Sequence, residues 1–412
     1  MLSYSLIIFC ITLLINPILC YIPETRIGHN SVIIHNQLLV FGGRKNESVD
    51  TSTYEMLYLD LTKPFDSKSN PWELLKEGYL PVYTYFSTSI VSTLDDDIIY
   101  LIGGYRLNIT TNEYENSNVV YMYNYSTIKW TTPEVDNATP RQEITGVTDN
   151  KGTVYIFGGN NMTNFTMGTL YNDMQIFNVS TMIWSKLSIN HNLPSPSCAY
   201  TATILKNGII VYLGGVENDK GNYISRSEVT FSSMKTIRLF DTLKTEWLQM
   251  NVTGGDDIAP RVFHSSVLTT DGHIILFGGV GGKNTAIGPK LAILDTNKDI
   301  YEWRIPSSSD SSPYLYAHTA NLYGNYMIVT FGYDMDNKDR NSQIYLLDVT
   351  HYTWVTTYTP PIITKPFSKA LAIGLGVGGG IFLATLISIG VRFFKRHRHT
   401  SILKIPGSAS II

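Results

Sequence analysis

Cysteine is the scarcest residue in this 412-residue chain, with three copies, and its scarcity sets the first limit on the fold. Cys10 and Cys20 lie in a short apolar run at the start of the sequence, so Cys198 has no intrachain partner outside that run. A small secreted domain held by disulfides is therefore excluded. About 340 residues lie between the two apolar ends of the chain, and a core of that size can hold together without such bonds.

The common signatures of nucleotide and hydrolase chemistry are also absent. The chain has no zinc-hydrolase, P-loop or serine-elbow pattern. Residues 278–283 are rich in glycine, but their spacing is wrong for a P-loop and Asn284 stands where a hydroxyl is needed. Gly374, Gly376 and Gly379 satisfy G-x-G-x-x-G, yet no strand precedes them and they fall in an apolar run. We therefore predict no catalytic residue and no bound cofactor.

Apolar segments at both ends of the chain predict where it resides. The run from Ser5 to Cys20 is too short to span a bilayer and is broken by Pro17, as in a cleaved signal peptide over 1–20; a retained anchor is the alternative. Residues 370–391 are 22 consecutive uncharged residues, which at about 1.5 Å per residue cross a hydrocarbon core of about 30 Å. The second segment is therefore predicted to be a transmembrane helix.

Charge is distributed unevenly around the second segment. The residues after Val391 include five basic side chains and no acidic one, so a total of −3 leaves −8 on everything before them. The positive-inside rule predicts a single-pass type I protein of the cell surface or a secretory-pathway membrane, with a linker over 361–369 and a basic cytoplasmic tail over 392–412. The acidic ectodomain is a poor partner for nucleic acid. Gly374 and Gly378 have the small-xxx-small spacing that could let two such helices associate, although glycine richness alone also explains the pair.

A repeated pattern of two glycines and one tryptophan covers most of the chain. The glycine pairs follow apolar or β-branched runs at intervals of 54 to 64 residues, and a degraded copy with one glycine completes the set: Gly42-Gly43, Gly103-Gly104, Gly158-Gly159, Gly214-Gly215, Gly278-Gly279 and Gly332-Tyr333. All the tryptophans of the chain follow these pairs, 22 to 33 residues later: Trp72, Trp130, Trp184, Trp247, Trp303 and Trp354. Between each pair and its tryptophan lies an alternating run that ends in Asp or Asn. The chain thus carries six copies of one structural unit.

Each unit is predicted to form four antiparallel strands. A first strand such as 29–34 turns into a second, 37–41, after which the glycines admit conformations or close neighbours that a Cβ would block. The Asp or Asn closes the turn between the third and fourth strands with its own side chain. The indole that opens the fourth strand can fill the gap between neighbouring sheets, because one twisted sheet cannot bury both of its faces alone.

The order of glycine pair, aromatic strand and tryptophan resembles the kelch repeat family, whose fold is a β-propeller. The resemblance covers roughly residues 24–358 and predicts a repeat domain over 21–360. The expected fold class is all-β, a six-bladed kelch-type β-propeller plus one C-terminal transmembrane helix. How the ring closes stays open. The family includes protein-binding modules, glycan-related surface proteins and, in galactose oxidase and its relatives, copper enzymes, so the resemblance alone does not define the function.

The galactose oxidase resemblance implies a copper held by two histidines and two tyrosines, one of them joined to a cysteine. Cys198 is the cysteine available, and Tyr200 lies two residues along the same strand face, a constrained neighbour for a cross-link. Those enzymes also resemble seven-bladed propellers with further domains, whereas this chain has six repeats. A surface copper oxidoreductase is therefore the disfavoured alternative.

Histidine recurs at one position in three repeats. His29, His264 and His318 precede the first glycine of their repeats by 13, 14 and 14 residues, and in a ring of six the first, fifth and sixth repeats are neighbours. Three imidazoles suffice for zinc or copper, which makes these residues the candidate metal ligands. The favoured alternative is a repeat position at which a histidine bonds to a neighbouring backbone.

Eight N-x-[ST] sequons precede the predicted membrane helix and favour a glycoprotein, although a chain so rich in Asn, Ser and Thr would carry about five by chance. They are Asn46, Asn108, Asn124, Asn137, Asn161, Asn164, Asn178 and Asn251. Asn124 and Asn178 also occupy the turn position before the tryptophan, where the side chain has a competing role.

The connections after the second and fourth strands of each unit should share one face of a propeller, here called the long-loop face. Its loops differ in length, charge and aromatic content, whereas the opposite turns are short. This difference favours the long-loop face for recognition. The alternative is that the long loops are merely tolerated insertions. The candidate binding residues are Tyr105, Arg106, Asn222, Tyr223, Arg226 and Tyr333. The favoured function is a membrane-anchored extracellular binding or adhesion module for an unknown protein or glycan.

Overall fold

The structure is a computed structural model that describes residues 21–45, 53–69, 71–111, 113–115, 118–162, 168–223, 229–308, 312–361 and 392. The chain divides into two units after Pro360, and every strand belongs to the first. The signal peptide predicted over 1–20 and the membrane helix predicted over 370–391 lie outside the described residues. Within the described ranges, no helix is long and apolar enough to cross a membrane.

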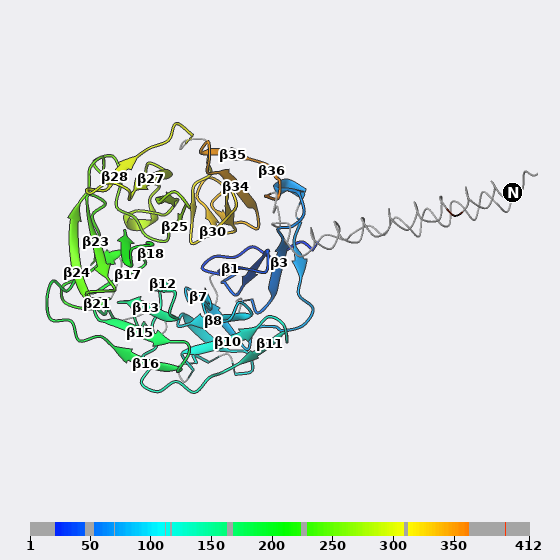
Figure 1. Cartoon of the computed structure of the whole chain (residues 1–412), viewed down its shortest axis with the longest axis horizontal. Coiled ribbons are helices and arrows are strands. Elements are labelled where there is room, and N and C mark those ends of the chain that lie inside the picture. The colour runs from blue at the N-terminus through cyan, green and yellow to red at the C-terminus, as the bar shows by residue number, and fades with distance from the viewer. Residues whose placement is uncertain are drawn as a thin grey trace, which may run out of the picture. The chain divides into compact units, whose positions relative to one another are not determined.

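Six four-stranded antiparallel sheets, here called blades 1 to 6, form a ring (Figure 1). In each blade the chain runs in sequence order from the innermost strand to the outermost, and the innermost strands contact one another around the axis. The strands are, for blade 1, β1 (Asn30–Ile34), β2 (Gln37–Phe41), β3 (Met56–Asp60) and β5 (Glu73–Leu74); for blade 2, β7 (Thr88–Val91), β8 (Ile98–Ile102), β10 (Val120–Asn124) and β11 (Lys129–Thr131); for blade 3, β12 (Gly146–Thr148), β13 (Thr153–Phe157), β15 (Met174–Asn178) and β16 (Ile183–Lys186); for blade 4, β18 (Thr201–Ile204), β19 (Ile209–Leu213), β23 (Thr236–Asp241) and β24 (Glu246–Asn251); for blade 5, β25 (Ser265–Leu268), β26 (His273–Phe277), β27 (Leu291–Asp295) and β28 (Glu302–Arg304); and for blade 6, β30 (Thr319–Tyr323), β31 (Tyr326–Thr330), β34 (Ile344–Asp348) and β35 (Thr353–Val355). The all-β fold with six blades is as the sequence predicted.

Short extra ribbons occur mainly at the ends of blades 2, 4 and 6. They are β6 (Val82–Tyr85) with β9 (Tyr105–Asn108), β17 (Ser197–Cys198) with β20 (Val216–Glu217) and β22 (Thr230–Phe231), and β29 (Leu315–Tyr316) with β32 (Tyr333–Asp334) and β33 (Asp339–Arg340). A further pair, β14 (Gly168–Thr169) with β21 (Asn222–Tyr223), joins the long loops of blades 3 and 4. The 3₁₀ turns η2 (Ser67–Ser69) and η3 (Gly282–Asn284) complete the elements.

The glycine pairs hold neighbouring blades together. In every blade one motif glycine donates its backbone N–H to a carbonyl of the next blade, over 2.7 to 3.0 Å. It is the second glycine in blades 1 to 5 and Gly332 in blade 6, where Phe331 takes the place of the first glycine: Gly43 to Thr84, Gly104 to Arg141, Gly159 to Ser197, Gly215 to Arg261, Gly279 to Leu315 and Gly332 to Arg26. The first glycine approaches the same carbonyl, so that a Cβ on Gly158 would stand 2.4 Å from the oxygen of Ser197. The motif is therefore glycine because two backbones meet there.

The tryptophans lie between blades, as predicted. Each packs with the apolar residue that precedes the glycine motif of the previous blade, either as a ring pair 4.6 to 6.0 Å apart or within one apolar cluster: Trp72 with Phe331, Trp130 with Phe41, Trp184 with Ile102, Trp247 with Phe157, Trp303 with Leu213 and Trp354 with Phe277. Because each indole contacts two blades, its burial stabilises the ring as well as its own sheet.

The predicted Asx turns are confirmed in all six blades. The last residue of each third strand accepts a backbone N–H from the following turn, over 2.8 to 3.0 Å: Asp60, Asn124, Asn178, Asp241, Asp295 and Asp348. The side chain thus satisfies the turn amides that no strand can pair.

The ring closes where blade 6 meets blade 1, and each blade takes its four strands from one continuous stretch of the described chain. After blade 6, β36 (Thr357–Tyr358) pairs with β4 (Phe65–Asp66). The Tyr358 ring is fully buried, and its hydroxyl donates to the carbonyl of Leu61 over 2.8 Å. Closure therefore combines side-chain packing, a two-residue strand pair and backbone bonds between blades 6 and 1, such as that from Gly332 to Arg26.

Candidate functional site

Tyr105 and Arg106 lie beneath the surface, which corrects their assignment to a binding face. Both belong to β9, and both side chains are about 2% exposed. The Tyr105 ring stacks on Tyr85 with centroids 4.9 Å apart. Burial lowers the pKa of the Arg106 guanidinium, whose Nε and Nη1 have no hydrogen-bond partner among the described residues. Neither side chain can contact a ligand at the surface.

The other candidate residues of the long-loop face are placed differently. Tyr333 is half-buried and its ring lies 5.0 Å from that of Tyr316. The backbones of Asn222 and Tyr223 form β21, which pairs with the loop of blade 3. Arg226 lies outside the described residues. Tyr333 is thus the candidate whose partly exposed side chain the structure describes.

An apolar cluster joins all six blades at the long-loop end of the ring. Its members precede the innermost strands or follow the glycine motifs, and one from each blade in turn is Ile27, Tyr85, Met162, Val216, Val262 and Ala317. Residues from six blades can share one cluster only near the axis. Apolar side chains therefore fill the axis at this end, which sequence reasoning did not foresee.

A cavity of about 140 Å³ adjoins this cluster and is lined by residues that begin the innermost strands. The lining includes one position from every blade, always with a φ between 52° and 62°: Gly28, Phe86, Glu143, Ala199, Phe263 and Ala317. Successive members are linked by N–H to carbonyl bonds of 2.8 to 3.0 Å, from Phe86 to Gly28, Glu143 to Phe86, Ala199 to Glu143, Ala317 to Phe263 and Gly28 to Ala317. These five backbone bonds thus link the six positions in turn around the axis, from Phe263 to Ala199.

The three candidate histidines line the same cavity, but each of them bonds to the preceding blade. The Nε2 atoms reach the preceding blade: His264 the Leu213 carbonyl at 3.1 Å, His318 the Ser265 hydroxyl at 2.8 Å and His29 the Thr319 hydroxyl at 2.7 Å. Burial lowers the pKa of His264 and of His318 to about 3, and that of His29 well below its usual value. The rings are therefore neutral near pH 7. Within the described part of the chain, no group of three His, Cys, Asp or Glu residues is arranged to hold a metal ion.

The residues that a copper oxidase would cross-link have other partners. Cys198 is buried outside any disulfide, and its thiol lies 3.1 Å from Glu143 Oε2. The Tyr200 hydroxyl donates to the carbonyl of Phe157. Thiol and phenol thus face different neighbours, and nothing in their geometry supports the oxidoreductase alternative.

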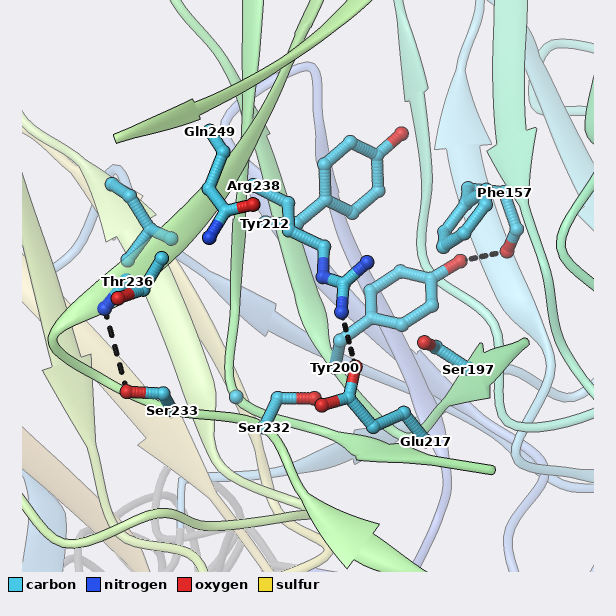
Figure 2. A pocket seen from close by; sticks show the side chains of 12 residues that line it. Phe157, Ser197, Tyr200, Tyr212, Glu217, Ser232, Ser233, Thr236, Arg238 and Gln249 are labelled. Carbon is cyan, nitrogen blue, oxygen red and sulfur yellow. Dashed lines mark hydrogen bonds and ion pairs between the residues drawn. The ribbon is translucent and has the colours of Figure 1, made fainter. Parts of the chain in front are cut away.

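A half-open pocket of about 150 Å³ lies between blades 3 and 4 at the long-loop end (Figure 2). One wall is aromatic and comes from Phe157, Tyr200 and Tyr212. The polar wall is formed by Arg238 of β23, Gln249 of β24 and residues of the blade 4 loop, namely Glu217, Ser232 and Ser233. Tyr212, Arg238 and Gln249 lie side by side because β19, β23 and β24 pair in that register.

Charges within this inter-blade pocket are balanced. Arg238 donates to Glu217 in an ion pair whose side chains are 29% and 21% exposed. Figure 2 shows the Arg238 guanidinium beside the Tyr200 ring, between Gln249 and Glu217. Burial raises the pKa of the Tyr200 and Tyr212 hydroxyls, so both stay protonated donors. The Tyr212 hydroxyl is buried and has no hydrogen-bond partner among the described residues.

Sequence reasoning missed this pocket because its polar residues lie on strands as well as loops. Arg238 and Gln249 stand between apolar residues within the strands Thr236–Asp241 and Glu246–Asn251. A charged or amide side chain at such a position was the available signal. The prediction had instead selected loop residues and had considered Tyr200 only as a cross-link partner.

The sequons divide into three groups. Asn46 and Asn164 lie outside the described residues, and Asn137 and Asn251 are exposed. In the others the Oδ1 atom accepts a nearby backbone N–H, as at Asn108, Asn124, Asn161 and Asn178. Asn161 also donates through Nδ2 to the Tyr171 hydroxyl, a bond that a glycan at this atom would replace.

Comparisons with known proteins agree on the fold. A family model described as "KLHDC2/KLHL20/DRC7 Kelch-repeats domain" matches residues 16–215 and 221–383. The chain is 27% identical over 272 residues to Kelch domain-containing protein 3 of Bos taurus, covering 63% of this chain and 65% of that one, and 22% identical over 356 residues to Acyl-CoA-binding domain-containing protein 4 of Arabidopsis thaliana, covering 82% and 47%. This chain therefore spans slightly less than two thirds of the length of the first relative and about half of the length of the second.

A solved structure extends the agreement to three dimensions. The structure of YjhT superposes with a TM-score of 0.59 at 13% identity, covering 81% of this chain and 97% of that one. At this identity the likeness concerns the fold alone. The family model, in contrast, spans well over half of the chain and describes the repeats found here. The chain therefore belongs to the kelch-repeat family.

Proposed function

We propose that this chain is a membrane-anchored extracellular kelch propeller that binds a protein or glycan ligand through its long-loop face. The observation that carries the proposal is the inter-blade pocket, which opens at this face and combines an aromatic wall with donors and acceptors. Such mixed linings are typical of recognition sites.

The location rests on the sequence. The uncharged run over 370–391, the basic residues after it and an acidic remainder favour a type I anchor. Exposed sequons such as Asn137 and Asn251 are compatible with a glycosylated surface. The linker over 361–369 would then separate the propeller from the bilayer.

Topology can be tested with the full chain carrying a C-terminal epitope tag. Trypsin applied to intact cells is expected to remove the propeller and leave a short tagged fragment protected, because the tail lies inside. Glycosidase treatment should increase the gel mobility of the untreated chain. Full-length protein released into the medium, or a tag digested on intact cells, would contradict the proposal.

Binding can be located by blocking each end of blade 4. Ser233 is exposed at the long-loop end and Lys244 at the opposite turn. In a screen of glycans and secreted proteins against cells displaying the full chain, Ser233→Trp is expected to abolish binding of a hit, because the indole covers the pocket. Lys244→Trp should leave it unchanged, and the reverse pattern would reject this face.

A further inference from the structure

The inter-blade pocket is matched in size to one small ring. Its volume of about 150 Å³ is close to that of a protein cavity known to hold a six-membered ring. The pocket is half-open, so a ring bound there could continue into a longer ligand outside. A folded protein domain is too large to enter this pocket, whereas one unit of a chain-like ligand can enter it.

The lining defines the chemistry of that ring. Arg238 and Glu217 neutralise each other, so a charged ligand would gain no free partner and would have to separate the pair. Together with Gln249 and the loop serines they offer many donors and acceptors within a small volume. The ligand should therefore be neutral and carry hydroxyl groups in several directions.

The opposite wall adds an apolar surface. The rings of Tyr200 and Tyr212 lie 5.3 Å apart, and Tyr212 is 6% exposed. The C–H face of a saturated ring suits an aromatic wall of this kind.

We propose that the pocket between blades 3 and 4 binds one uncharged monosaccharide unit, a neutral six-membered polyol ring. The inference rests on the proposed function in one respect, since it identifies the ligand of the long-loop face as a glycan. Arg238, Glu217 and Gln249 bind its hydroxyl groups, while Tyr200 and Tyr212 contact the ring.

The test uses the full chain in detergent and a panel of neutral hexoses, with glucuronate and glucosamine as charged counterparts. At least one neutral sugar is expected to bind with a dissociation constant in roughly the millimolar range. Gln249→Ala should weaken that sugar about two- to tenfold, the effect of one hydrogen bond. Ser233→Trp, which covers the pocket, should abolish its binding.

Glu246→Gln is the matched control, because Glu246 lies at the opposite end of β24 and is exposed. This variant should bind as the unaltered chain does. The inference is overturned if no neutral sugar binds at roughly 10 mM, if glucuronate or glucosamine binds more tightly, or if the pocket variants bind normally. A surface-exposed propeller that binds a protein with no sugar affinity would reject this inference and leave the proposed function standing.

Discussion

Three glycine substitutions separate the two reasons for which glycine is required in the blades. Gly158 has a φ of +59°, and a Cβ there would stand 2.4 Å from the Ser197 carbonyl. Gly221 has a φ of +66°, but its nearest neighbour would be 3.5 Å away. Gly282 lacks a positive φ, and its nearest neighbour would be 3.8 Å away. From Gly282 to Gly221 the series therefore adds the cost of a positive φ, and from Gly221 to Gly158 it adds the steric cost of a close backbone neighbour.

The expected changes in the free energy of unfolding follow from these terms. Gly282→Ala should be neutral or stabilising by about 0.4 to 1 kcal/mol, because alanine restricts the unfolded chain. Gly221→Ala adds a left-handed residue that costs about 1 to 2 kcal/mol, for a net loss of about 1 kcal/mol. Gly158→Ala adds a further 1 to 3 kcal/mol of overpacking, about 2 to 4 kcal/mol in all.

The measurement is urea unfolding of the purified protein followed by tryptophan fluorescence. The contact at Gly158 is with a backbone carbonyl that also accepts the N–H of Gly159, so the neighbour cannot move without losing a bond between blades. Equal losses for Gly158→Ala and Gly221→Ala would show that conformation alone requires the glycine. The inter-blade explanation of the motif would then be wrong.

Further predictions concern packing, pH and buried charge. Trp184→Ala should lower the free energy of unfolding by about 3 to 5 kcal/mol while the exposed Lys283→Ala is nearly silent, and equal thermal shifts would refute the blade assignment. The pKa of His318 is about 3 in the folded chain and near 6.5 in the unfolded chain, so below pH 6.5 the unfolded chain binds more protons. The free energy of unfolding should therefore fall by about 1.4 kcal/mol for each unit by which the pH is lowered between 6.5 and 3. His318→Gln should remove this contribution, measured by unfolding at several pH values, and leave the similar contributions of His29 and His264 in place. Arg106→Met should raise the free energy of unfolding by about 1 to 3 kcal/mol, since it removes a buried cation whose Nε and Nη1 have no partner among the described residues; a clear destabilisation in thermal unfolding would contradict this.

The fold could be predicted because its markers act between repeats. Gly158, Trp247 and Asp241 each mark one interaction that every blade repeats, namely the contact with the next blade, the contact with the previous blade and the closing turn. The spacing of these residues along the sequence therefore predicts how neighbouring blades contact one another around the ring. The strand predicted over 37–41 coincides with β2 for the same reason.

The site could not be predicted to the same degree. Tyr105 follows a glycine pair and was assigned to a loop, but β9 pairs with β6 and turns both Tyr105 and Arg106 inward. The pocket requires the packing of blade 4 against blade 3, which no repeat marker encodes. Arg238 shows the difficulty, since its role depends on the space that its neighbours leave around it.

The seam between blades 6 and 1 has a consequence for biosynthesis. Thr319, the partner of His29, lies 290 residues further along the chain. At about 5 to 20 residues per second, the first blade waits roughly 15 to 60 seconds at the ribosome before its neighbour is made. During that time the face that will pack on blade 6, including Leu38, Val40 and Trp72, has no cover from its own chain. Nascent blade 1 is therefore the stretch on which a chaperone would act longest.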